Sequence, residues 1–184
     1  MIITFIVFAS VYCYDYFFSQ KPRSKKPAPN SLITDMHVIK TDQNGTMIYR
    51  LLSRKAYHYV TENRSELTAP IGYYYVKQQP YWTATAEHGQ TLNGDEIVHL
   101  FGHVYMHQDA GKNNHEITLR TSKAMLYPQK QIAENRVFVK VEQPGMGVTS
   151  VGFHANMRKG NIILLSKVQG YFVAENKQST QSST

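Results

Sequence analysis

Apolar and polar residues alternate along the segment from Ile97 to His107, IVHLFGHVYMH. One face of this segment carries Val98, Leu100, Gly102, Val104 and Met106. Because side chains of a β-strand point to opposite faces in turn, the pattern predicts a strand with one buried face. The turn signal Leu92-Asn93-Gly94-Asp95 precedes it, so residues 82–107 are predicted to form strand, turn and strand.

Two later segments share this layout. Residues 121–124 are followed across a proline by the strand 136–141, and residues 152–155 are followed across a glycine by the strand 162–172. The spacing from Ala124 to Val137 equals the spacing from Ala155 to Val168. A hairpin repeat of about 30–40 residues predicts a stacked antiparallel β architecture.

The first half of the chain also reads as strands, at 32–39, 47–52, 56–60 and 67–76. Pro70 interrupts the last of these, which predicts an edge or a bulge there. No helical periodicity is present beyond the N-terminus, so the predicted fold class is all-β.

The chain is divided into four parts. Residues 1–19 are predicted to be a transmembrane anchor, because Ile2–Phe18 contains no Lys or Arg and would span about 26 Å as a helix. A cleaved signal peptide is the alternative, although no charged region precedes the apolar run. Residues 20–31 form a basic, proline-rich linker, 32–174 the β domain, and 175–184 a polar tail predicted to be disordered.

The formal net charge is +7, and Lys21, Arg23, Lys25 and Lys26 supply much of it. A basic cluster beside an apolar segment is typical of a membrane surface and does not indicate nucleic acid. By the positive-inside rule, the same cluster would keep the domain in the cytoplasm. The charge pattern alone therefore argues against a location on the far side of that membrane.

Catalytic, metal and cofactor sites are not predicted. The single cysteine rules out an internal disulfide and lies in the apolar N-terminal run. His99, His103 and His107 lie in a predicted strand, where four-residue steps of about 13 Å are too long for one ion to bridge. No nucleophile elbow, P-loop or dinucleotide fingerprint is present, so we expect no enzyme.

Apolar side chains from several strands are the main candidate site. They are predicted to line one inner surface, either as an open trough or as the core of a closed β-sandwich that works only through its edge strands. A third option is a basic surface that binds polysaccharide or nucleic acid. The candidate inner surface consists of Met36, Leu67, Leu100, Val104, Val137, Val139, Ile162, Leu164 and Phe172.

Several patches resemble one known family. The run from Gly45 to Leu51 (GTMIYRL), then Ala56 with Tyr57 and Tyr59, then Leu67 and Pro70, is similar to the opening of the LptC family of lipopolysaccharide export. Trp82, Ala86 and the run from Leu100 to Val104 (LFGHV) resemble its central hairpin, and the match extends to Phe172.

The resemblance implies an open, V-shaped antiparallel β-jellyroll in the periplasm, built of stacked hairpins and tethered to the inner membrane by one N-terminal helix. It implies transfer of lipopolysaccharide from the ABC transporter LptB, LptF and LptG to the bridge protein LptA, without cofactor or nucleic acid. An N-terminal edge strand would meet the transporter and a C-terminal one LptA, and an edge strand could also form a homodimer. The edge residues assigned in this way are Gly45, Tyr49, Arg50, Val168 and Tyr171.

Overall fold

The computed structural model describes residues 28–76, 79–94, 96–111 and 115–172. The anchor predicted for 1–19, most of the linker and the tail lie outside these ranges. Within them, no helix has the length and apolar character needed to cross a bilayer.

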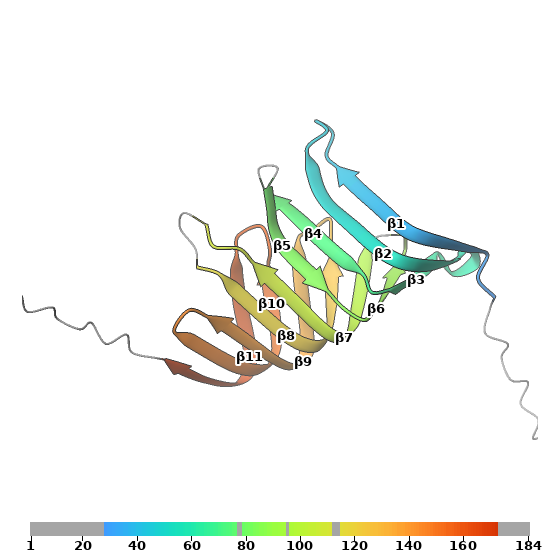
Figure 1. The fold of residues 1–184 in the computed structure, drawn as a ribbon. Coiled ribbons are helices and arrows are strands. Elements are labelled where there is room, and N and C mark those ends of the chain that lie inside the picture. Colours follow the sequence, from blue (N-terminus) through green and yellow to red (C-terminus); the bar gives the residue numbers. More distant parts are fainter. Residues whose placement is uncertain (1–27, 77–78, 95, 112–114, 173–184) are drawn as a thin grey trace, which may run out of the picture.

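The described residues form antiparallel strands and one short 3₁₀ helix, η1 (Val60–Glu62). The strands follow one another along the molecule, with β1 at one end and β11 at the other (Figure 1). Most consecutive strands pair, but β3 pairs with β2 and β6, and β5 pairs with β4 and β7. The strands are β1 (Ser31–Thr41), β2 (Met47–Tyr59), β3 (Arg64–Thr68), β4 (Ile71–Val76), β5 (Gln79–Thr85), β6 (His88–Leu92), β7 (Ile97–Gln108), β8 (Ile117–Tyr127), β9 (Ile132–Gln143), β10 (Met146–Asn156) and β11 (Asn161–Phe172).

The sheet is folded into two arms that share their long strands. Residues 55–59 of β2 pair with β3, whereas residues 49–52 pair with β4. In the same way, residues 97–101 of β7 pair with β6 and residues 105–108 pair with β5. We call arm 1 the set containing β3, β6 and the adjoining halves of the long strands, and arm 2 the set containing β4, β5 and the other halves.

A corner joins the arms where the long strands change direction. Register shifts occur there in the β7–β8, β8–β9, β9–β10 and β10–β11 pairs. Bulges of this kind bend a strand and leave backbone groups without their ladder partners. The backbone φ is positive at the corner in several of these strands, at Asp35, Gly102, His103, Gly152 and Lys167.

Short polar side chains on the corner bind the carbonyl groups that the bulges release. Ser53 donates to the carbonyl of Lys55 at 2.7 Å, and Ser150 donates to that of Gly152 at 2.8 Å. Thr121 donates to the carbonyl of Phe138 at 2.7 Å. A buried carbonyl without a partner is destabilising, so these hydrogen bonds stabilise the bent strands. They also explain why polar side chains lie on the inner side of the corner.

The core fills the space between the arms. Trp82, Met106 and Leu119 of arm 2 and Phe153 of arm 1 are all less than 2% exposed. The alternation predicted for β7 is confirmed, because Val98, Leu100, Val104 and Met106 are buried. The predicted turn after β6 is also confirmed, with positive φ at Asn93 and Gly94.

Two predicted segments differ from the structure. Residues 47–52 and 56–60 were expected as separate strands, but β2 runs through both and bends near Arg54. The expected strand 67–76 is divided at Pro70, which separates β3 from β4. Ala69 has a positive φ and Pro70 is fully buried, so the chain turns there from arm 1 into arm 2.

Candidate functional site

Four of the predicted inner-surface residues lie in the middle of the core. Leu67 and Leu100 come from arm 1, and Val104 and Val139 from arm 2. None is more than 3% exposed, and all belong to one cluster of contacting side chains. These side chains contact one another across the arms, so a ligand reaches them only if the arms separate.

The inner surface is open at the two ends of the stack. Met36 on β1 and Ile162 and Leu164 on β11 are partly buried and pack against the core. Phe172 pairs with Met146 on the same face as buried Val141, yet it is 80% exposed. Val168 follows the same alternation and is 54% exposed. The apolar interior therefore continues to solvent beyond the last strand.

Little free space remains between the arms along their open side. Tyr49, Gly72 and Tyr74 of arm 2 face Val98, Leu126 and Pro128 of arm 1 across a pocket of about 20 Å³. That volume is close to that of a single water molecule and excludes an acyl chain. At this place the two arms pack against each other.

The ends of the two arms that lie away from the corner also contact each other. In arm 2, Trp82 and Gln108 lie directly opposite each other on β5 and β7. A Cβ atom on Gly160, in the turn between β10 and β11, would lie 2.7 Å from the Tyr81 hydroxyl and 3.1 Å from Gln108 Oε1. We use the term seam for the contact of Tyr81 and Gln108 with the turn 157–160, together with Trp82 opposite Gln108.

Three polar atoms at the seam are buried without hydrogen-bond partners in the described part of the chain. They are Trp82 Nε1, Gln108 Nε2 and Gln108 Oε1. A buried polar group without a partner costs about 1–3 kcal/mol, so the closed seam is destabilised locally.

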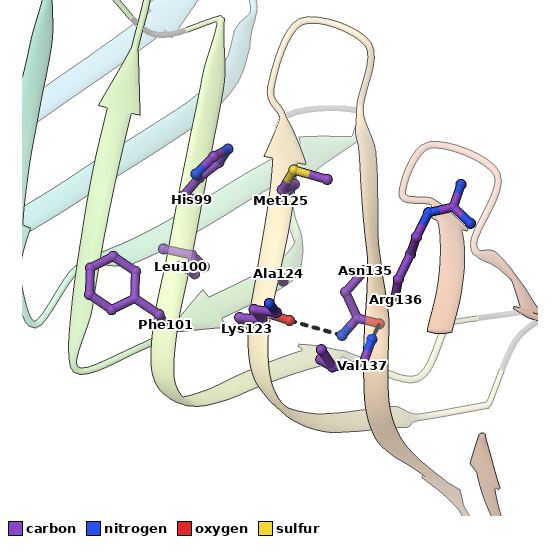
Figure 2. Close-up of a pocket in the computed structure, with 9 residues that line it drawn as sticks. All are labelled: His99, Leu100, Phe101, Lys123, Ala124, Met125, Asn135, Arg136 and Val137. Carbon is purple, nitrogen blue, oxygen red and sulfur yellow. Dashed lines mark hydrogen bonds between the residues drawn. The ribbon is translucent and has the colours of Figure 1, made fainter. Parts of the chain in front are cut away.

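A separate pocket of about 460 Å³ lies on the outward side of the corner, where β8 and β9 stop pairing (Figure 2). His99, Phe101, Lys123 and Met125 alternate with buried Leu100 and Ala124, so they point away from the core. Of the predicted inner-surface residues, the half-buried Val137 and the buried Leu100 line this pocket. Asn135 bridges the gap by donating to the Lys123 carbonyl at 2.8 Å (Figure 2).

The outer face of arm 2 carries a charged network. Arg120 and Lys140 both pair with Glu142, and the Arg120 guanidinium lies over the Tyr105 ring. The hydrogen bond from Lys140 lowers the pKa of Glu142, against the opposing effect of partial burial.

A second charged cluster lies on arm 1, where Arg64 lies over the Tyr59 ring and pairs with Glu62 and Glu66. Burial raises the pKa of the Tyr59 phenol.

The free edges of the sheet are β1 and β11. Tyr49 and Arg50 lie in β2, which pairs with β1 on one side and with β3 and β4 on the other. The N-terminal edge is therefore β1, whereas Gly45 lies in the turn that joins β1 to β2. Val168 and Tyr171 lie on the edge strand β11 and are exposed.

Several histidines of the described ranges contact polar side chains. His103 lies 2.7 Å from Glu87 at the corner, and His107 contacts Thr118 and Asp109. Within those ranges no group of three or more His, Cys, Asp or Glu side chains is arranged to hold a metal ion.

Sequence reasoning missed the seam and the polar residues of the corner. Gln108 continues the alternation of β7 by one further step, and this was the available signal for its burial. The corner residues carried a weaker signal, a serine or threonine two positions before the carbonyl it binds, as in Ser53 and Ser150.

Comparisons with known proteins agree with this geometry. The solved structure of LptH from Pseudomonas aeruginosa, described as the LptA-homologous periplasmic component of its lipopolysaccharide transport device, matches with a TM-score of 0.54 and 9% identity. The match covers 68% of this chain and 95% of that one, which shows a shared fold. A search of curated protein sequences gave no match. The family model described as "Lipopolysaccharide-assembly, LptC-related" matches residues 1–173. The chain therefore belongs to the LptC-related family of lipopolysaccharide-assembly proteins, which are transport components and not enzymes.

Proposed function

We propose that this protein receives lipopolysaccharide from the inner-membrane transporter LptB, LptF and LptG and passes it to the periplasmic bridge LptA. The acyl chains lie between the two arms during transfer. The observation that carries the proposal is the apolar interior that continues to solvent at both ends of the stack, through Val38 on β1 and Val168 and Phe172 on β11.

The hydrophobic effect explains why such an interior is useful. Each acyl CH₂ gains about 0.8 kcal/mol on leaving water, so a chain of about twelve carbons costs on the order of 10 kcal/mol to expose. An apolar interior removes most of that cost. The free energy of the lipid then changes little when it passes between two similar interiors. The direction of transfer is set by ATP hydrolysis in the transporter.

The closed state leaves about 20 Å³ between Tyr74 and Leu126, so the arms must separate to take a chain. The predicted V-shaped, open form is the loaded state in this proposal. Leu67, Leu100, Val104 and Val139 then line the groove, and Met36, Ile162, Leu164 and Phe172 extend it to the ends. Val137 contacts lipid only where the corner also opens.

Each of the two edge strands binds a different partner in this proposal. The β1 edge meets the periplasmic part of the transporter, and the β11 edge adds a strand of LptA by β-augmentation. Residues 1–19 anchor the chain in the inner membrane with the domain in the periplasm, and 20–31 hold the domain off the surface.

A second candidate is a membrane-tethered scaffold that works only through its edge strands. The fully packed middle of the core favours it, because nothing there requires a ligand. Neighbouring residues on β11 separate the two functions. Ile162 packs against the core, whereas Ile163 points outward and is 56% exposed.

The experiment is co-purification of lipopolysaccharide with the full-length chain from membranes, measured as lipid per folded protein. Ile162→Glu places a charge on the inner surface and should reduce the bound lipid several-fold. Ile163→Glu is the matched control and should retain it. Equal loss in both variants, or no bound lipid in the parent chain, would favour the scaffold.

A further inference from the structure

Trp82 and Gln108 form a pair of buried polar side chains for which the fold has no evident need. They are 1% and 0% exposed and lie directly opposite each other on β5 and β7. The indole N–H and both atoms of the amide have no partner among the described residues. Buried amides are nearly always hydrogen-bonded, so a site with three such atoms calls for an explanation.

Gln108 lies where the free end of arm 1 meets arm 2. The turn 157–160 lies against Gln108, with Gly160 next to the Gln108 amide and the Tyr81 hydroxyl. Arm 1 holds this turn through Gln131, whose carbonyl accepts from the Met157 amide at 2.8 Å and whose side chain accepts from Arg158 at 2.8 Å. The turn can therefore move away together with the free end of arm 1.

We propose that the seam is the part of the domain that opens to admit an acylated lipid, and that Trp82 and Gln108 bind the polar end of its acyl chain. The inference rests on the proposed function and adds the place of opening and the contact residues. Opening the seam exposes Trp82 and releases three unpaired polar atoms, whereas separating the arms through the middle would expose Phe153 and Leu119. The seam is the side that is easiest to open.

The chemistry of the three atoms defines the ligand group. The Trp82 indole and the Gln108 amide nitrogen are donors, and the Gln108 carbonyl is an acceptor. A carbonyl or carboxyl oxygen at the head of an acyl chain accepts from both donors, and a hydroxyl or amide N–H beside it donates to the Gln108 oxygen. The chain itself then lies along Met106 and the neighbouring core, which is apolar.

The first test replaces Gln108 by methionine, which has similar size and no amide. In the closed state Gln108→Met removes two unpaired atoms, so the melting temperature of the full-length protein should rise by about 2–4 °C. The affinity for dodecanoic acid should fall about tenfold, because the bound head group loses its amide partners. A lower melting temperature with unchanged affinity would show an ordinary, satisfied core amide and overturn the proposal.

The second test pushes the turn away. Gly160→Gln introduces a side chain where a Cβ alone would overlap the Tyr81 hydroxyl and lie 3.1 Å from Gln108 Oε1, so the seam should open and fatty-acid binding should become faster. Gly45→Gln is the matched control, because Gly45 has φ +77 against +67 at Gly160 and no atom lies within 4 Å of its Cβ position. Both variants carry the same backbone strain, so an equal change in binding rate would count against the seam.

The third test uses the single tryptophan as a position sensor. Bromine quenches indole fluorescence on close approach. Because Trp82 should meet the head of the chain, 2-bromododecanoic acid should quench it several-fold more than 12-bromododecanoic acid at equal occupancy. Equal quenching, or stronger quenching by the 12-bromo acid, would overturn the assignment of these contacts.

The outcomes separate this inference from the proposed function. Saturable lipid binding that is insensitive to Gln108→Met and Gly160→Gln leaves a lipid-binding interior and overturns only the seam. Absence of saturable binding to the parent chain counts against both.

Discussion

Asn135 Nδ2 lies 2.8 Å from the Thr121 hydroxyl oxygen, and this hydrogen bond spans the gap where β8 and β9 stop pairing. The same amide group donates to the carbonyl of Lys123 at 2.8 Å. Asn135 is only 4% exposed, so it replaces ladder hydrogen bonds inside the corner. The corner is therefore held by side chains as well as by backbone pairing.

Replacing Asn135 by alanine should destabilise the domain by about 1–3 kcal/mol, because the Lys123 carbonyl loses its partner inside the protein. Urea unfolding of the full-length chain measures the change. Gln129→Ala, at an exposed position of the turn after β8, is the control and should have little effect. A stability loss no larger than that of Gln129→Ala would contradict the role of Asn135.

Gly102 tests the geometry of the corner in a second way. A Cβ there would lie 2.5 Å from Glu87 Oε2 and 2.9 Å from Glu87 Cβ, at a φ of +77. Gly94 has φ +76 and no atom within 4 Å of its Cβ position. Gly94→Ala should cost about 1–2 kcal/mol through the backbone alone. Gly102→Ala should lower the stability measured by thermal unfolding clearly more than Gly94→Ala does. An equal loss of stability in the two variants would show that the corner tolerates the extra atom.

The ion pairs of Glu142 predict that the stability of the fold decreases slightly at acid pH. Its pKa is lowered in the folded state by the hydrogen bond from Lys140. The stabilisation is therefore present above the pKa of the unfolded carboxyl and is lost as the pH falls through the lower folded value. Because the pair is partly exposed, the effect should be below about 1 kcal/mol.

Glu142→Gln should remove this part of the pH dependence and leave stability near neutral pH slightly reduced. Unfolding curves of the parent and the variant between pH 7 and pH 3 measure the difference. Convergence of the two curves as the pH falls is the expected result, and parallel curves would contradict it.

Hydrogen exchange tests the assignment of the edges. If LptA adds a strand at the β11 edge, as proposed, LptA should slow amide exchange along β11 (Asn161–Phe172), because the added strand pairs with its free backbone groups. The opposite edge, β1 (Ser31–Thr41), should exchange at an unchanged rate and serves as the internal control. Protection of β1 in place of β11 would reverse the assignment.

The sequence predicted the strands and their buried faces well wherever the alternation of residues was unbroken. In β7 the alternation from Val98 to Met106 passes through the bulge at Gly102 without changing face, so the buried side was correct. In β2 the alternation of buried and exposed residues is interrupted at Arg54, where the strand bends. This interruption was interpreted from the sequence as a break between two strands. A bend and a loop have the same local signature, and only pairing with distant strands separates them.

The candidate site was harder to predict because burial depends on which arm faces which. Phe172 and Leu67 both continue an apolar face, yet one is at the open end and the other at the centre of the core. Gln108 continues the alternation of β7 by one step, but the turn at Gly160 that lies against it is distant along the chain. Such contacts leave no periodic signal.

Photo-crosslinking during ATP-driven transport tests the central claim most directly. A photoreactive amino acid is placed in turn at Leu67 in the interior, at Phe172 at its open end and at Tyr105 on the outer face of β7. If lipid travels between the arms, lipopolysaccharide is captured at Leu67 and Phe172 and the capture depends on ATP. Capture at Tyr105 alone would contradict the account.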